Sequence, residues 1–350
     1  MTGNFLPEKP WRPVRRVEYD GGRSGQTATV PPLRPPGACR GVSVVMFGFA
    51  LRRLQIAILV AVTVSIVGFG LLRASGDIAL VLAGENARPE DVRRVAHAYG
   101  LDRPLYMQYF SWAGHALRGD LGRSLFTNEP VSELIVSRLP VTIFVAVPAL
   151  VFAVLIAVPL GVLAAARQNS WIDRLSLSFA VTGQALPSFW FALILIYVFG
   201  VMLRWLPISG SDHWSNFILP WVTVAIGVIP SQMRLTRAGM LDVLSADFVR
   251  TARAKGLGPW PIMFKHALRN AILPVVSISA VNLGFLLGSS VIVESVFALN
   301  GVGQLAYQSI LRLDFPVVQS IIVFISFAYI VLTFVADLIN ARLDPRIALR

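Results

Sequence analysis

The sequence predicts an all-α polytopic membrane protein with six transmembrane helices. Its composition supports this class, because 55% of the residues are hydrophobic and only 14% are charged, whereas soluble domains carry about 25% charged residues. A second observation is a series of six long apolar runs that contain no Asp, Glu, Lys or Arg. A run of about 20 such residues is long enough to cross a bilayer as a helix. We therefore expect one helical bundle embedded in the membrane.

Residues 1–45 precede the apolar runs and are rich in Pro, Gly and Arg, without apolar periodicity. This composition is typical of a disordered tail, which we place in the cytoplasm. Met46 begins a segment that resembles the usual start of a protein. Part of the preceding tail is therefore expected to be an artefact of the assigned translation start. A dispensable tail and a regulatory tail both remain open.

The six apolar runs are the predicted transmembrane helices. The first follows Arg52 and Arg53, and it is favoured as an anchored helix over a signal peptide because it is long and lacks a small-residue cleavage site. Placing both termini in the cytoplasm puts 21 of the 31 Lys and Arg residues on that side, as the positive-inside rule requires. The runs are residues 54–72, 141–166, 175–203, 217–233, 271–293 and 317–336.

The long loop 73–140 is predicted to be extracytoplasmic and helical. Pro89, followed by two acidic residues, predicts the start of one helix, and Gly100 predicts its end. Pro104 predicts a second helix that runs towards Gly119 and carries several aromatic side chains suited to a bilayer interface. Two interpretations of these aromatic residues are compatible: a cap over the bundle, and a docking surface for an external partner.

Several function classes lack their motifs in this sequence. The three lysines precede Pro10, Gly256 and His266, so no Gly-Lys-Ser/Thr phosphate loop is present and the chain is not expected to hydrolyse ATP. The four histidines lack ligand spacing, and no nucleophile elbow is visible; no catalytic, cofactor or metal site is predicted. The single Cys39 excludes an internal disulfide. The net charge of +12 fits basic cytoplasmic loops, so no nucleic-acid partner is predicted.

The apolar runs also lack the charges that ion-driven transporters place inside the membrane. Glu294 and Asp337 lie just beyond the fifth and sixth runs. A stand-alone secondary transporter, coupled to protons or sodium, would therefore lack its usual parts. A purely structural scaffold is a third possibility. The favoured interpretation is a pathway that another protein drives.

Residues 247–274 interrupt the apolar chain with five basic residues against one acidic residue. Ser245 is predicted to cap a helix there, and Gly256 is predicted to end it. A second helix, residues 260–269, leads back to the bilayer, and Pro274 breaks the entry into the fifth run.

The first of these two helices has an apolar face and a basic face. Phe248 and Ala252 are four residues apart and share one side, while Arg250 and Arg253 are three apart and share another. The alternative is an ordinary cytoplasmic loop that follows the positive-inside rule, which would require only the basic charge. The capping and the turn favour a protruding helix that fits a groove on a cytoplasmic partner.

This segment resembles the cytoplasmic EAA loop of binding-protein-dependent ABC importer permeases. That pattern is Glu-Ala-Ala, three residues, Gly, and later Leu-Pro; here Arg-Thr-Ala stands at 250–252, followed by Gly256 and by Leu-Pro at 273–274. Arg in place of Glu departs from the general pattern but is similar to the dipeptide, oligopeptide and nickel branch. Further stretches support the resemblance: GLDRPL (100–105), GDLGRSL (119–125), LPSFW (186–190), LPISG (206–210), VIVESVF (291–297), DFPVVQ (314–319) and LDPRI (343–347).

The resemblance, which covers residues 47–347, implies a type I ABC importer permease of the bacterial plasma membrane and the first permease subunit of its pair. It implies four partners: a second homologous permease in a heterodimer, cytoplasmic ABC ATPase subunits that use ATP and Mg, an extracytoplasmic substrate-binding protein, and the lipid bilayer. The implied cargo is di- and oligopeptides, with nickel chelates, glutathione and haem as alternatives. The predicted ATPase contacts are Asp247, Phe248, Arg250, Thr251, Ala252, Arg253, Lys255, Gly256 and Leu257.

Polar residues in the third and fifth runs are candidates for lining the pathway. Hydrogen bonding between helices is the other open interpretation, and the more common one for such residues in membranes. Pro187 and Pro230 each free a backbone carbonyl within a run and are predicted joints. The pathway candidates are Gln184, Asn282, Ser289, Ser290 and Glu294.

Overall fold

The computed structural model describes residues 39–74, 76, 78–84 and 87–343. The described part is helical, and its one β-type pairing is an isolated antiparallel bridge between Arg123 and Pro130. The all-α prediction is therefore confirmed. The chain divides into two units, residues 1–43 and 44–350, and the helices below belong to the second except for the first residues of α1. The predicted tail lies outside the described residues up to position 38, but residues 39–45 already belong to α1.

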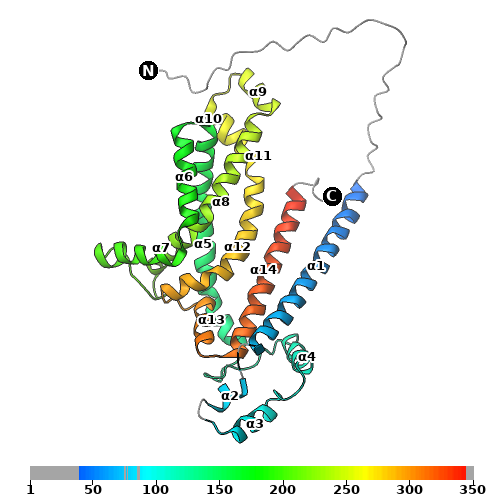
Figure 1. The fold of residues 1–350 in the computed structure, drawn as a ribbon. Coiled ribbons are helices and arrows are strands. Elements are labelled where there is room, and N and C mark those ends of the chain that lie inside the picture. The colour runs from blue at the N-terminus through cyan, green and yellow to red at the C-terminus, as the bar shows by residue number, and fades with distance from the viewer. Residues whose placement is uncertain (1–38, 75, 77, 85–86, 344–350) are drawn as a thin grey trace. The chain divides into compact units, whose positions relative to one another are not determined.

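Among the described residues, five stretches of helix are long and apolar enough to cross a membrane, and they match five of the six predicted runs, with residues 271 and 272 of the fifth run outside its stretch. Most of these helices extend beyond the apolar runs at one or both ends, where polar residues also have helical geometry. They are α1 (Cys39–Ala74), α5 (Val131–Ala166), α8 (Ile218–Leu244), α12 (Leu273–Val296) and α14 (Phe315–Leu343), all labelled in Figure 1.

The third predicted run is not one straight helix, and it breaks at Pro187, where the sequence predicts a joint. It consists of α6 (Trp171–Ala185), α7 (Ser188–Leu195) and a π-helical continuation (Ile196–Met202), with a bend of 101° between the two halves. In Figure 1, α7 turns away from the direction of α6. Pro187 is the N-cap of α7, and Leu186 before it is extended, as the residue before a proline prefers. By contrast, α8 remains one helix through Pro230, and a joint there stays a prediction.

The main hydrophobic cluster lies where α5, α8 and α12 meet, and α12 also packs against α14. On α5, Ala146, Ala149, Ala153 and Ala157 are fully buried in the main hydrophobic cluster. Such small side chains allow helices to approach closely in a membrane. Gly161 shows how close this approach is, since an added Cβ would lie 2.8 Å from the carbonyl oxygen of Met233 on α8.

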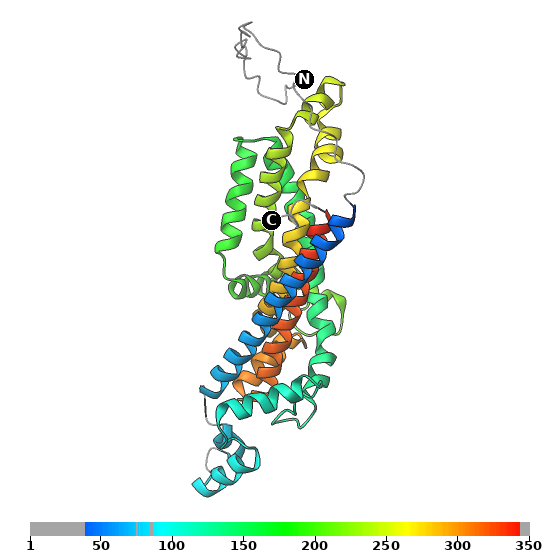
Figure 2. The same ribbon diagram turned by 90° about the vertical axis from the view of Figure 1, so that its right-hand side faces the viewer.

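The segment between α1 and α5 contains α2 (Ile78–Ala83), α3 (Pro89–Ala98) and α4 (Leu105–Ala116). The two predicted helices are confirmed, whereas α2 was not predicted. Gly100 and Gly119 follow α3 and α4 with φ values of +66° and +84°, a conformation that glycine adopts at little cost. Figure 2 shows α4 running across the end of α1, where Tyr109 contacts the Phe69 ring at 5.5 Å between centroids.

A second unpredicted helix, α13 (Val302–Leu311), connects α12 to α14. The turn after it is tied to the loop before α5 by Asp314, whose side chain is buried. Asp314 accepts hydrogen bonds from the Ser124 hydroxyl at 2.6 Å and from the Leu125 backbone N–H at 3.2 Å. These bonds join two conspicuous stretches of the sequence, GDLGRSL and DFPVVQ.

Candidate functional site

The basic segment forms α9 (Asp247–Ala254), directly after α8. The prediction that Ser245 caps α9 is wrong. Ser245 is the C-cap residue of α8, and its hydroxyl donates to the Asp242 carbonyl at 2.7 Å. The N-cap of α9 is Ala246, which is extended and offers no side-chain cap. The two helices are so close in sequence that the hydroxyl is already used in the last turn of α8.

The predicted end of α9 at Gly256 is confirmed. Gly256 has φ +81°, its N–H donates to the Arg253 carbonyl at 2.9 Å, and the Leu257 N–H donates to the Ala252 carbonyl at 3.2 Å. This pair of bonds around a left-handed residue is a Schellman motif. No atom lies within 4 Å of a Cβ added at Gly256. The backbone conformation, rather than lack of space, favours glycine here.

The inner face of α9 is apolar and packs on its own chain. Val249 and Ala252 are buried against Ile262, with Leu244 at the edge of the cluster. Ala252 was predicted as a partner contact, but in this structure it anchors α9. Val249 was missed because the sequence analysis paired Phe248 with Ala252 at a spacing of four. The spacing of three from Val249 to Ala252 would have identified the buried face.

The outer face of α9 continues onto the next helical segment, α10 (Pro259–Pro261) followed by a π-helical stretch (Ile262–Ala267). Trp260 and Phe264 are exposed and stack with ring centroids 5.4 Å apart. Neither was predicted, although two aromatic residues four apart in a basic loop were visible in the sequence. The α9 surface, as we name it, comprises the exposed residues Asp247, Phe248, Arg250, Thr251, Arg253, Lys255, Gly256, Leu257, Trp260 and Phe264.

Charge on the α9 surface is positive and little neutralised. The ion pair between Arg250 and Asp247 has a distance of 3.6 Å, and both side chains are largely exposed. Such a surface pair contributes little to stability. Arg253 and Lys255 are exposed as well. The arrangement offers basic groups and apolar rings to a partner, held on a small rigid platform.

The platform is joined firmly to the bundle. Ala267 and Ala271, the latter in α11 (Leu268–Ala271), pack against Met240 of α8 and Val162 of α5. At Gly239 a Cβ would lie 3.0 Å from the Ala271 carbonyl oxygen, so the backbones touch with no side chain between them. A force applied to α9 would therefore act on α5, α8 and α12.

A buried ion pair fastens α6 to α8 within the bundle. The Asp173 carboxylate is only 3% exposed and receives two hydrogen bonds of 2.7 Å from Arg237. The Asn169 backbone N–H donates to the same carboxylate at 3.0 Å. Sequence analysis missed this pair because both residues lie just outside the apolar runs. Nearby, Arg234 of α8 donates to the side-chain oxygen of Gln184 on α6 at 3.0 Å. Gln184, one of the pathway candidates, thus links α6 to α8.

Of the candidates on α12, Glu294 is fully buried. Its carboxylate accepts hydrogen bonds from the Gly303 and Gln304 backbone N–H groups at 2.7 and 3.1 Å and from the Ser290 hydroxyl at 3.0 Å. The two backbone N–H groups belong to the first turn of α13, so Glu294 caps this helix from the end of α12. Thr142 of α5 accepts from the preceding N–H, that of Val302, at 2.9 Å.

The structure does not gather the five pathway candidates into one lining. Among these five described residues, only Ser290 and Glu294 are hydrogen-bonded to each other. Ser289 is exposed and bonds back to the Leu286 carbonyl. Asn282 is half-buried, and its side-chain nitrogen has no hydrogen-bond partner in the described part of the chain. Lining of the pathway by these residues stays a prediction.

Two family models match the chain. One describes a binding-protein-dependent transport system inner membrane component and matches residues 157–349; the other describes the N-terminal part of such a component and matches residues 46–146. The chain belongs to this family. This permease is thus a multi-pass component of an ABC importer, and permeases of this class work with ATPase and binding-protein partners.

Curated relatives and a solved structure agree with this assignment. The glutathione transport system permease protein GsiC of Escherichia coli K12 is 39% identical over 303 residues, which cover 86% of this chain and 99% of the relative. GsiC of Salmonella typhimurium is 38% identical over the same coverage. An inward-facing MetNI methionine ABC transporter has a TM-score of 0.52 and 20% identity, covering 62% of this chain and 99% of the other. That likeness supports the type I importer permease fold alone.

Proposed function

We propose that this permease forms half of the translocation pathway of an ABC importer for glutathione and other short peptides, and that an ATPase subunit docks on the α9 surface. The observation that carries the docking part is the exposed combination of Phe248, Trp260 and Phe264 with Arg250, Arg253 and Lys255 on one anchored platform. Aromatic and arginine side chains are the residues that most often dominate binding energy at protein interfaces.

The cargo assignment rests on the relatives. GsiC proteins that share 38–39% identity over nearly their whole length are named for glutathione transport. Glutathione is itself a short peptide, so the relatives and the peptide-type motifs support the same chemical class. An external binding protein would deliver the cargo and set much of its selection.

The proposed mechanism is mechanical. ATP binding closes the ATPase pair and displaces α9, whose buried residues Val249 and Ala252 transmit the movement to Ile262. From there the backbone contact between Gly239 and Ala271 passes it to α8 and α12. A second, homologous permease would complete the pathway as a heterodimer, with both termini of this chain in the cytoplasm. ATP and Mg would be used by the ATPase subunits, and this chain would bind no cofactor.

The experiment that tests this function starts with gentle purification of the tagged chain from its native membrane and mass spectrometry of the co-purifying proteins. We expect a P-loop ATPase and a second permease, and glutathione uptake by the reconstituted complex only when ATP and the binding protein are present. A chain that elutes alone and still transports without ATP would instead establish a secondary transporter.

Replacing Trp260 tests the docking surface directly. Trp260→Ala should reduce ATPase binding by about tenfold or more, since truncating a central aromatic residue of an interface typically costs about 2 kcal/mol. The readout is the amount of ATPase that co-purifies at a fixed expression level. Trp214→Ala is the matched control, because Trp214 is 67% exposed but lies before α8, far along the chain from α9. Equal loss in both variants would contradict docking at α9.

A further inference from the structure

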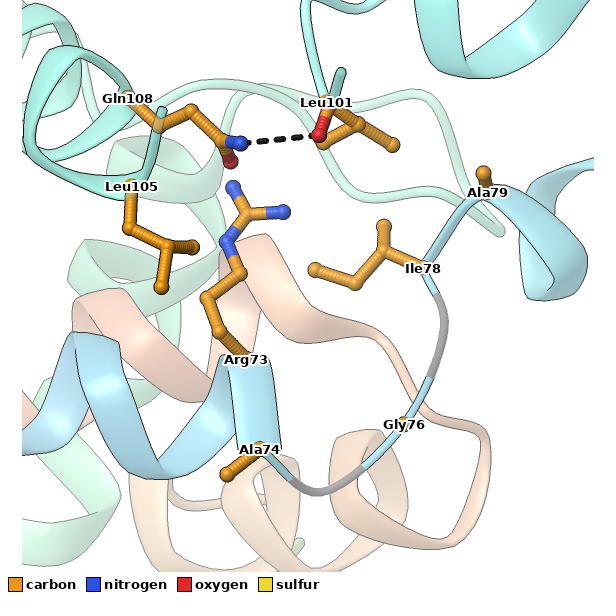
Figure 3. Close-up of a pocket in the computed structure, with 8 residues that line it drawn as sticks. All are labelled: Arg73, Ala74, Gly76, Ile78, Ala79, Leu101, Leu105 and Gln108. Atoms are coloured by element: carbon orange, nitrogen blue, oxygen red, sulfur yellow. Dashed lines mark hydrogen bonds between the residues drawn. The ribbon is translucent and has the colours of Figure 1, made fainter. Parts of the chain in front are cut away.

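A cavity lies where the end of α1 meets α2, α4 and the start of α14. It has two adjoining lobes of about 360 and 690 Å³, which share Arg73, Ile78, Leu101 and Gln108 in their walls. We call it the α1–α4 cavity. Figure 3 shows the smaller lobe, with the Arg73 guanidinium reaching from the end of α1 towards Gln108 and Leu101.

The described residues that line the α1–α4 cavity carry an excess of positive charge. Arg73, Arg103 and Arg123 line it, with Asp120 as the one acidic residue among the described lining residues. The Asp120 carboxylate already accepts the Gly122 backbone N–H at 3.0 Å. Within the described part of the chain, none of these three arginines forms an ion pair. Guanidinium groups in such a setting favour an anionic ligand.

Unpartnered hydrogen-bond donors in the same walls point to the same chemistry. The Trp112 indole N–H and the Gln319 side-chain nitrogen are buried and have no partner in the described chain. The Gln108 amide is oriented by its two donations, to the Leu101 and Arg103 carbonyl oxygens at 2.9 and 2.7 Å. Buried donors are nearly always satisfied in native proteins. A ligand rich in acceptor oxygens would satisfy both donors and Arg73. The buried Gln108 side-chain oxygen also lacks a partner in the described chain and needs a donor instead, and Arg123 already donates to the Asn128 carbonyl at 2.7 Å.

The position of the cavity selects the source of that ligand. Arg73 lies in the last turn of the membrane-crossing part of α1, which ends at Ala74. On α4, Tyr106 is 59% and Phe110 is 69% exposed, and such amphipathic rings collect at the level of the lipid headgroups. Leu105, also exposed, forms part of the cavity wall. The cavity therefore opens beside the polar boundary of the bilayer.

We propose that the α1–α4 cavity binds the phosphate headgroup of an anionic phospholipid, with Arg73 as its main ligand and Trp112 and Gln319 as supporting donors. Basic pockets between transmembrane helices on the cytoplasmic side bind anionic headgroups, and the α1–α4 cavity, on the predicted extracytoplasmic side, would use the same chemistry. This inference depends on the membrane placement of α1 and is independent of the cargo and of ATPase docking. Free phosphate offers the same acceptor oxygens as a lipid headgroup, and the experiment below distinguishes the two ligands.

The test uses the complete importer complex in nanodiscs of phosphatidylcholine, with or without phosphatidylglycerol, and native mass spectrometry of bound lipid. Wild type should retain phosphatidylglycerol, and Arg73→Gln should bind it about tenfold more weakly, because a charge-assisted hydrogen bond is lost. Trp112→Phe, which keeps the ring but removes the N–H, should also weaken it. Arg118→Gln is the matched control: Arg118 is exposed and outside the described cavity walls.

Equal phosphatidylglycerol binding by wild type, Arg73→Gln and Trp112→Phe would overturn the proposal. Inorganic phosphate is then added to the nanodiscs that contain only phosphatidylcholine. If it occupies the wild-type complex there, and if it also displaces phosphatidylglycerol at equal concentration from the nanodiscs that contain this lipid, the ligand is a free anion and the lipid assignment is wrong. If Arg73→Gln does not fold, the comparison of Trp112→Phe with Arg118→Gln decides alone.

Discussion

Gly256→Pro is expected to abolish uptake while the protein still inserts into the membrane and ATP hydrolysis continues. Gly256 has φ +81°, whereas proline is fixed near −65°. Proline also removes the N–H that donates to the Arg253 carbonyl at 2.9 Å. The end of α9 would unravel, and Leu257 and the following aromatic pair would lose their fixed position relative to α9. The measurement is ATP hydrolysis and glutathione uptake by the same reconstituted complexes.

A graded series makes this prediction sharper. Gly256→Ala keeps the N–H and meets no atom within 4 Å, so its cost is the left-handed conformation alone, roughly 1–2 kcal/mol. We expect partial uptake from this variant. Gly258→Ala is the control, because Gly258 has φ −67° and its added Cβ makes an ordinary contact of 3.9 Å with Pro261. Wild-type uptake by Gly256→Pro would rule out transmission of force through α9.

The long helices could be predicted from the sequence because their signal is large and local. An uncharged apolar run of about 20 residues has few alternatives to a membrane-crossing helix. The bend after α6 was harder to predict, since a proline in an apolar run either breaks a helix, as Pro187 does, or is accommodated, as Pro230 is in α8. What separates the two is the packing around each proline, which no local pattern contains.

The same limit applies to the polar residues. Glu294 was predicted to line the pathway because it falls near one side of the fifth span, at helical spacing from other polar residues. In the structure it caps α13, a helix that the sequence did not reveal, so its partners could not be predicted either. The end of α9 at Gly256 was predictable, because a glycine signal acts within one turn. The buried face of α9 could also be identified from the spacing of three between Val249 and Ala252. Its partner Ile262 could not, because it lies 13 residues beyond Val249 and belongs to another element.

The ion pair between Asp173 and Arg237 is expected to make a large contribution to the stability of the folded permease. Asp173→Asn should lower the free energy of unfolding by about 3 kcal/mol, because removing one partner leaves a poorly solvated charge on the other. The Arg237 side chain is only 21% exposed, so water can compensate it only in part. The measurement is chemical unfolding in detergent, followed by a probe of helix content.

A double-mutant cycle separates the pair from its surroundings. Arg237→Gln combined with Asp173→Asn should be more stable than the sum of the two single losses predicts, since no lone charge remains. The exposed pair of Asp247 and Arg250, at 3.6 Å, is the matched control and should show no measurable coupling, because water and salt screen it. Equal coupling in both cycles would mean that burial of Asp173 does not strengthen its pairing. The α6–α8 contact would then be held by apolar packing and by the hydrogen bond from Arg234 to Gln184.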